Sequence, residues 1–221
     1  MSFIHKILQN PTFKTLTVNF TYLSLLKCLG LLFPLITYPI VIRTVGAENY
    51  GIVVYSQSII AYFVIIINFG FDVSATRRSS ESREDIVELC KIYSSITYLK
   101  LIMFILCVVI SIPFFILIHY EHLLILFLLV GLCIQEIAFP VWLFQGLEKM
   151  KFITILSFLS QCLYVLLILV FIREACDYYL IPVFMSIGGI VTSIGSIYIL
   201  RNRFRIKLVS VTLSRLKQDF K

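Results

Sequence analysis

The sequence predicts an all-α, polytopic membrane protein: a bundle of six transmembrane helices with both termini in the cytoplasm. Of the 221 residues, 60% are hydrophobic and only 14% are charged, whereas soluble domains are about half apolar and about a quarter charged. The apolar residues gather in six runs of spanning length, and the basic residues gather in alternate connections between those runs. These three observations together favour a multi-pass membrane bundle over a soluble domain.

The six apolar runs define the expected spans in order. Each is long enough to cross about 30 Å of hydrocarbon as an α-helix. Uninterrupted runs of this length lack the alternation of membrane strands and satisfy their backbone polar groups internally as helices. The runs cover residues 16–42, 50–71, 92–118, 123–144, 152–172 and 179–200.

The basic residues set the expected orientation. Of the 19 Lys and Arg residues, Lys27 and Lys100 fall within spans, and only Arg43 and Arg173 fall in connections on one side. The remaining fifteen lie on the side that also carries both termini. Because cytoplasmic connections carry the excess of Lys and Arg, the sequence places both termini in the cytoplasm.

The segments outside the spans are expected to contain short helices. In the connection 72–91, Ser82 and Asp85 resemble a capping box before Ile86, which predicts a short helix running into the third span. We expect one lobe over residues 1–200 and a basic tail over 201–221. In that tail the helical spacing of Val209, Leu213, Leu216 and Phe220 predicts an amphipathic helix on anionic lipid. For the residues before Pro11, a surface helix and disorder both remain open.

Charged residues inside spans, and Arg43 at the end of the first span, are the candidate functional residues. Each charge inside a span costs about 2.5–3.5 kcal/mol at mid-helix unless it has a partner, a wet cavity or a route to the interface. Lys27 and Glu136 are expected at similar depth, either as a structural ion pair or as a substrate or proton-coupling site. Lys100 is expected to extend to the membrane interface, and Arg43 to anchor there or to contact an anionic headgroup or phosphate.

Uncharged polar and small residues within spans favour helix packing. Gly188, Thr192 and Ser196 recur four residues apart, and Gly189 with Ser193 forms a second stripe, which predicts close helix contact. Four amide side chains inside spans are expected to hydrogen-bond between helices rather than to contact a ligand. They are Gln57, Asn68, Gln135 and Gln161.

Enzymatic chemistry finds little support. The histidines His5, His119 and His122 lie outside the spans, so a membrane-embedded nucleophile would lack its base. A phosphate-cradling glycine loop is also missing from the sequence, and the outer loop that holds His119 and His122 is too short for its donors to converge on a metal. The sequence therefore predicts no enzyme, cofactor or metal site. The formal charge of +7 suggests lipid headgroups rather than nucleic acid.

Three strings carry a family resemblance. They are YPIVIRTVGAENYG at residues 38–51, NFGFDVSATRRSS at 68–80 and FPVWLFQGLEKMKFITILS at 139–157. The sequence resembles the O-antigen type of polysaccharide repeat-unit flippases, in the multidrug/oligosaccharidyl-lipid/polysaccharide exporter superfamily. The resemblance implies movement of undecaprenyl-pyrophosphate-linked oligosaccharide to the outer leaflet of a bacterial inner membrane. It suggests Lys27, Arg43 and Glu136 as cavity or gate residues, with Lys100 giving that cavity a net positive charge.

The length of the chain departs from the family pattern. Family members resemble two six-helix lobes around a shared cavity, and this chain resembles the N-terminal lobe alone. The resemblance therefore implies a fragment or truncated product that needs a second lobe, or a parallel homodimer. The alternative function is a non-transporting membrane remnant or a scaffold in glycan assembly.

Overall fold

The fold is given by a computed structural model that describes residues 11–117, 119–212 and 215–216. These residues form helices and include no β-strand. The helices in chain order are α2 (Pro11–Val45), α3 (Ala47–Asn68), α4 (Phe71–Glu81), α5 (Ile86–Leu117), α6 (Leu123–Ala138), α7 (Val141–Gly146), α8 (Met150–Phe171), the 3-10 helix η1 (Ala175–Tyr179) and α9 (Leu180–Arg203).

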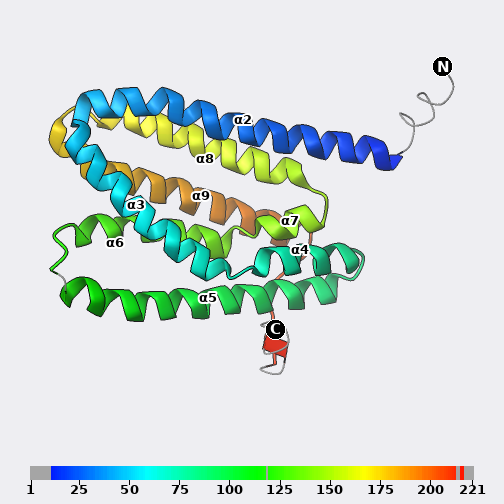
Figure 1. The fold of residues 1–221 in the computed structure, drawn as a ribbon. Coiled ribbons are helices and arrows are strands. Elements are labelled where there is room, and N and C mark those ends of the chain that lie inside the picture. Colours follow the sequence, from blue (N-terminus) through cyan, green and yellow to red (C-terminus); the bar gives the residue numbers. More distant parts are fainter. Residues whose placement is uncertain (1–10, 118, 213–214, 217–221) are drawn as a thin grey trace, which may run out of the picture.

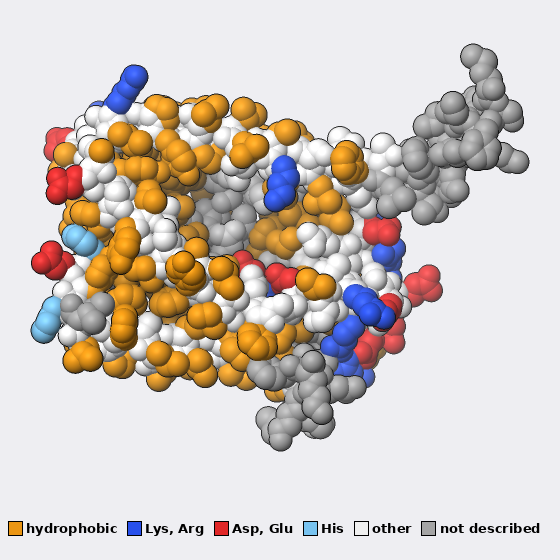
Figure 2. Space-filling model, viewed as in Figure 1, with side chains coloured by type: hydrophobic (Ala, Val, Ile, Leu, Met, Phe, Trp, Pro, Cys, Tyr) orange, Lys and Arg blue, Asp and Glu red, His pale blue; other side chains and the backbone are white. Residues whose placement is uncertain are grey.

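The six predicted spans are confirmed. Six helical stretches within the described residues are long and apolar enough to cross a membrane. Figure 2 shows hydrophobic side chains over the middle of the body and most charged ones toward its two ends, the distribution expected for a protein surrounded by lipid. The protein is therefore a multi-pass membrane protein.

Two spans differ from their expected bounds for backbone reasons. The second ends at Asn68 because Phe69 and Gly70 both adopt positive φ, at 38° and 78°, which a continuing right-handed helix excludes. The fourth is split into α6 and α7 at Pro140, which has no backbone N–H to donate.

The six long helices form two groups, which we call the two arms, and α9 joins them (Figure 1). Helices α2 and α8 pack together as one arm, α3, α5 and α6 form the other, and α9 packs against both α8 and α6. Helices α2 and α3 meet at Gly46 and then diverge. The start of α2 and the end of α9 lie toward the same end of the body as α4 and α7.

Small residues of α9 allow this helix to pack closely against α8 of one arm and α6 of the other. A Cβ on Gly188 would lie 2.6 Å from Ser160 Oγ of α8, and a Cβ on Gly189 would lie 2.7 Å from Gln135 Oε1 of α6. Real Cβ atoms do not approach other atoms so closely, and glycine at these positions lets the helices meet. The predicted role of the Gly188 and Gly189 stripes in close packing is confirmed.

The connection after α3 contains a helix that was not expected. The Ser82 N–H donates to the Arg78 carbonyl at 3.0 Å and ends α4. The Asp85 carboxylate accepts from the Val87 and Glu88 N–H groups, both at 3.0 Å, and so caps α5. The prediction that Ser82 begins a helix is therefore wrong. The expected continuity into the third span is confirmed, because α5 runs unbroken from Ile86 to Leu117.

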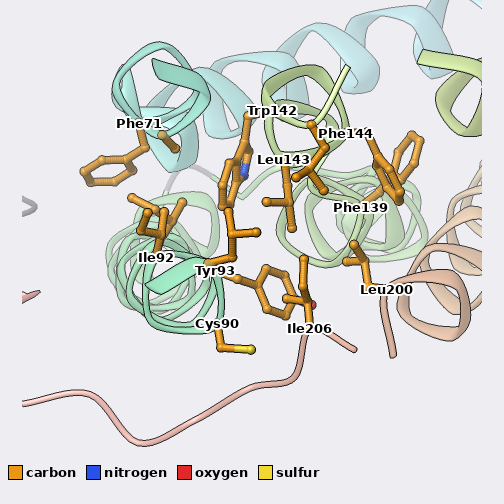
Figure 3. Close-up of a cluster of buried hydrophobic side chains, with 14 of the residues drawn as sticks. Phe71, Cys90, Ile92, Tyr93, Phe139, Trp142, Leu143, Phe144, Leu200 and Ile206 are labelled. Atoms are coloured by element: carbon orange, nitrogen blue, oxygen red, sulfur yellow. The ribbon is translucent and has the colours of Figure 1, made fainter. Parts of the chain in front are cut away.

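Two of the family-resembling strings meet in one buried cluster at the end of the body that holds α4 and α7 (Figure 3). Phe71 at the start of α4, Tyr93 of α5 and Trp142 of α7 belong to this cluster, and Trp142 is only 2% exposed. A Cβ on Gly146 would lie 2.7 Å from Ser79 Cβ of α4. Strings far apart in sequence thus form one structural unit.

The tail is extended where a helix was expected. Residues 204–212 have no helical assignment and run along α5. The Val209 N–H donates to Ser94 Oγ at 2.7 Å, Ile206 is buried, and Arg215 forms an ion pair with Glu88. The prediction of an amphipathic helix is therefore wrong for 204–212. Leu213, Phe220 and the N-terminal surface segment lie outside the described residues.

Candidate functional site

A cluster of three charges lies inside the bundle. Lys100 Nζ of α5 lies 2.8 Å from Asp72 Oδ1 of α4 and 3.4 Å from Glu136 Oε1 of α6. It also donates to the Glu136 backbone carbonyl at 3.4 Å. The Lys100 side chain is 2% exposed, whereas those of Asp72 and Glu136 are 38% and 29% exposed. The cluster therefore joins three helices through one buried ammonium group.

Backbone breaks bring the two acids to Lys100. Asp72 follows the positive-φ pair that ends α3, and this turn redirects the chain so that Asp72 reaches Lys100 of α5. Glu136 lies in the last turn of α6, just before the break at Pro140. Sequence reasoning missed Asp72 because the position was assigned to a polar connection. Gly70, two residues earlier, was the available signal for a sharp turn.

The structure corrects three predictions about these charges. Lys100 does not extend to the interface, because it is buried between two acids. Lys27 does not pair with Glu136: it is exposed on α2 and forms no ion pair among the described residues. The cluster carries two negative charges and one positive charge, a formal net charge of −1. The expected net positive cavity is therefore not what these residues form.

Arg43 lies in the last turn of α2 and is exposed. Its guanidinium group forms no ion pair among the residues that the structure describes. A cation there interacts favourably with the C-terminal end of the helix dipole. A role for Arg43 in contacting a headgroup or phosphate stays a prediction.

A hollow of about 260 Å³ lies between the two arms. We call it the polar hollow, and Figure 2 shows the surface recessed between α2 and α3. None of the side chains that line it is charged, so none of the four candidate residues contributes to its wall. It is lined by Phe33, Pro34, Thr37, Tyr38, Tyr50, Gln57, Leu132, Gln135, Ser157, Ser160, Gln161, Tyr164, Met185, Gly188 and Thr192.

Three of the four amides noted in the sequence line the polar hollow. Gln57 Nε2 of α3 donates to Met185 Sδ of α9 at 2.9 Å, which agrees with its expected role between helices. Gln135 packs over Gly189. Gln161 Oε1 is buried and has no hydrogen-bond partner among the described residues. The expectation of helix-to-helix bonding therefore does not account for Gln161.

Another ion pair, between Arg83 and Glu148, fixes the position of the connection between α7 and α8. Arg83 Nη2 lies 3.0 Å from Glu148 Oε1, and Arg83 Nε donates to the Gly146 carbonyl at 3.1 Å. Both side chains are about 40% exposed, so this pair positions the connection before α8 rather than forming a buried site. No group of three or more metal-ligating side chains converges in the described part of the chain.

The fold and the hollow define a multi-pass helical membrane protein with a polar interior. Comparison with known proteins gives the family. The chain belongs to the family described as "Polysaccharide biosynthesis protein", whose sequence profile matches residues 16–221.

Two curated relatives share the name "Putative O-antigen transporter". The one from Escherichia coli (strain K12) is 25% identical over 213 residues, covering 96% of this chain and 51% of the relative. The one from Shigella dysenteriae is 28% identical over 203 residues, covering 88% of this chain and 51% of the relative. The chain thus spans about half the length of these relatives. Comparison with solved structures gives no match.

Proposed function

We propose that this chain is one lobe of a carrier that moves undecaprenyl-pyrophosphate-linked oligosaccharide repeat units from the cytoplasmic to the outer leaflet of a bacterial inner membrane. The carrier serves O-antigen or polysaccharide biosynthesis. The observation that carries the proposal is the polar hollow between two arms of an otherwise apolar bundle. A hydrophilic glycan needs such an interior path, because lipid offers its hydroxyls no hydrogen bonds.

The proposed carrier needs a second lobe. The hollow opens between α2 and α3 (Figure 2), and closing it on that side takes another bundle. The second lobe is a further six-helix half of the same kind or a parallel copy of this chain. In this arrangement both termini face the cytoplasm, the orientation that the basic residues favour.

The buried charge cluster is proposed to hold the inner end of the lobe in one conformation. Lys100 connects α4, α5 and α6, and Asp72 and Glu136 are partly open to solvent. Removing any one of the three charges would remove an attraction that holds these helices together.

The test is complementation of a bacterial strain that lacks its own repeat-unit flippase, with surface polysaccharide displayed on a gel. The chain is expressed alone and together with the separately encoded second half of the E. coli relative. Polymer only upon co-expression supports the two-lobe carrier, and polymer from the chain alone supports a homodimeric one. Stable membrane expression without polymer in both arms overturns the proposal and favours a non-transporting remnant or scaffold.

A further inference from the structure

We propose that the polar hollow binds an uncharged sugar residue of the translocated glycan, while the diphosphate is held outside it, beside Lys27. This inference rests on the proposed transport function and assigns the two chemical parts of the substrate to different places on the lobe. It is carried by the kinds of side chain in the wall, by one unpaired acceptor and by the charge of the neighbouring cluster.

The wall of the hollow suits hydroxyl groups. A carboxamide offers both donors and acceptors, and a sugar hydroxyl also donates and accepts. Gln57, Gln135 and Gln161 bring such amides from three different helices. Among the side chains that line the hollow, Gln161 has a buried acceptor, Oε1, without a hydrogen-bond partner among the described residues, and such an atom is costly to leave unsatisfied. A hydroxyl placed in the hollow would satisfy it.

Aromatic rings complete the wall. Tyr38 and Tyr50 lie with ring centroids 5.8 Å apart and planes tilted by 54°, and Tyr164 lines the hollow from α8. Tyrosine combines an apolar face, which can cover the C–H face of a sugar ring, with a polar hydroxyl. At about 260 Å³ the hollow is smaller than the roughly 300–1,000 Å³ of pockets for drug-sized ligands. It therefore suits one small unit of a larger molecule.

The charges nearby exclude a phosphate from the same place. Phosphate oxygens are acceptors that bind best to cationic donors, and no cation lines the hollow. Gln135 of the wall is followed directly by Glu136 of the charge cluster, whose formal net charge of −1 repels a diphosphate. An anionic group would thus be disfavoured at the side of the hollow nearest Glu136.

Lys27 provides the separate contact for the diphosphate. It precedes Pro34 of the hollow by seven residues, close to two helical turns, so both lie on one face of α2 about 10 Å apart along the axis. Lys27 is exposed and forms no ion pair in the described part of the chain. Its ammonium group is thus available to an anion at that distance from a sugar in the hollow.

Saturation-transfer NMR on the purified full chain in lipid nanodiscs tests the assignment. The probes are three uncharged tetrasaccharides, of N-acetylglucosamine, glucose and mannose, and inorganic pyrophosphate as competitor. We expect saturation transfer to at least one tetrasaccharide, undiminished by pyrophosphate. The Gln161→Leu chain should bind that tetrasaccharide at least about tenfold more weakly than the natural chain. Gln145→Leu on α7, which does not line the hollow, is the matched control and should change nothing.

The outcomes distinguish this inference from the transport proposal. No transfer to any tetrasaccharide, equal binding by the Gln161→Leu chain, or displacement by pyrophosphate overturns the sugar site. Fluorescence of Trp142 checks that each variant retains the buried hydrophobic cluster that holds Trp142. Sugar binding that depends on Gln161 in a chain that supports no export overturns transport alone. Export that survives Gln161→Leu, without sugar binding, overturns the sugar site alone.

Discussion

Replacing Lys100 by methionine tests the buried charge cluster most directly. Methionine retains most of the side-chain volume and removes the ammonium group that lies 2.8 Å from Asp72 and 3.4 Å from Glu136. Removing one partner of a buried ion pair costs about 3–5 kcal/mol. The two acids keep 38% and 29% of their side-chain exposure, and water reduces the penalty of leaving them unpaired. We therefore expect a loss of about 3 kcal/mol in the free energy of unfolding.

The companion variants give an expected ranking. Asp72→Asn removes a charge but leaves an oxygen that can accept from Lys100, so we expect a loss of about 1–2 kcal/mol. Glu136→Gln should cost about 1 kcal/mol, because its contact is longer and the Glu136 carbonyl remains an acceptor at 3.4 Å. The triple variant replaces every charge by a neutral group and should recover most of the loss caused by Lys100→Met.

The assay uses the natural fluorophore of the chain. Trp142 is the single tryptophan, and it is buried in a cluster with Phe71, the residue before Asp72. Its fluorescence during an SDS titration in mixed micelles reports loss of this region. A Lys100→Met chain within about 0.5 kcal/mol of the natural chain, or a triple variant as unstable as the single one, refutes the reasoning. The double variant that exchanges the two charges, Lys27→Glu with Glu136→Lys, should not recover the stability lost in its single variants, because Lys27 and Glu136 are not partners.

Three further predictions concern packing, the surface pair and orientation. Gly131→Ala places a Cβ 2.4 Å from an α9 side chain and should lose about 1–3 kcal/mol in the same titration. Gly30→Ala, with nothing within 4 Å, should be neutral or stabilising by up to about 1 kcal/mol; equal losses would contradict the packing argument. A double-mutant cycle on Arg83 and Glu148, both about 40% exposed, should give a coupling of at most about 1 kcal/mol, and a larger coupling would mean a more buried pair. The exposed Cys176 between α8 and α9 should react with a membrane-impermeant maleimide in intact spheroplasts, with Cys176→Ser as control; labelling only after the membrane is opened would reverse the proposed orientation.

The six spans could be predicted because they depend on one-dimensional properties. Hydrophobic length alone decides whether a helix crosses a membrane, and the runs seen in the sequence match the helices to within a few residues at most ends. The small residues of α9 could also be assigned to helix packing, because small residues at a four-residue spacing have few other uses in a span.

Helix partners could not be predicted, because depth in the membrane does not specify which helices are neighbours. A shared depth allows an ion pair between Lys27 and Glu136 as one of two alternatives, yet α2 packs on α8 while α6 packs on α9 and α3. The two partners of Lys100 depend on two local breaks in the helices. One break is the positive-φ turn at Phe69 and Gly70, and the other is the interruption at Pro140. These breaks redirect the chain and bring Asp72 and Glu136 to one ammonium group.

The sequence by itself determined the class of protein, the number and approximate bounds of its spans, and the family strings. Only the tertiary structure decided that Gln57, Gln135 and Gln161 share the wall of one hollow, that no charged side chain lines it, and that residues 204–212 lie extended along α5. The physical reason is that hydropathy acts on each segment separately. The pairing of polar groups depends instead on which helix faces meet, and close packing between distant segments settles that.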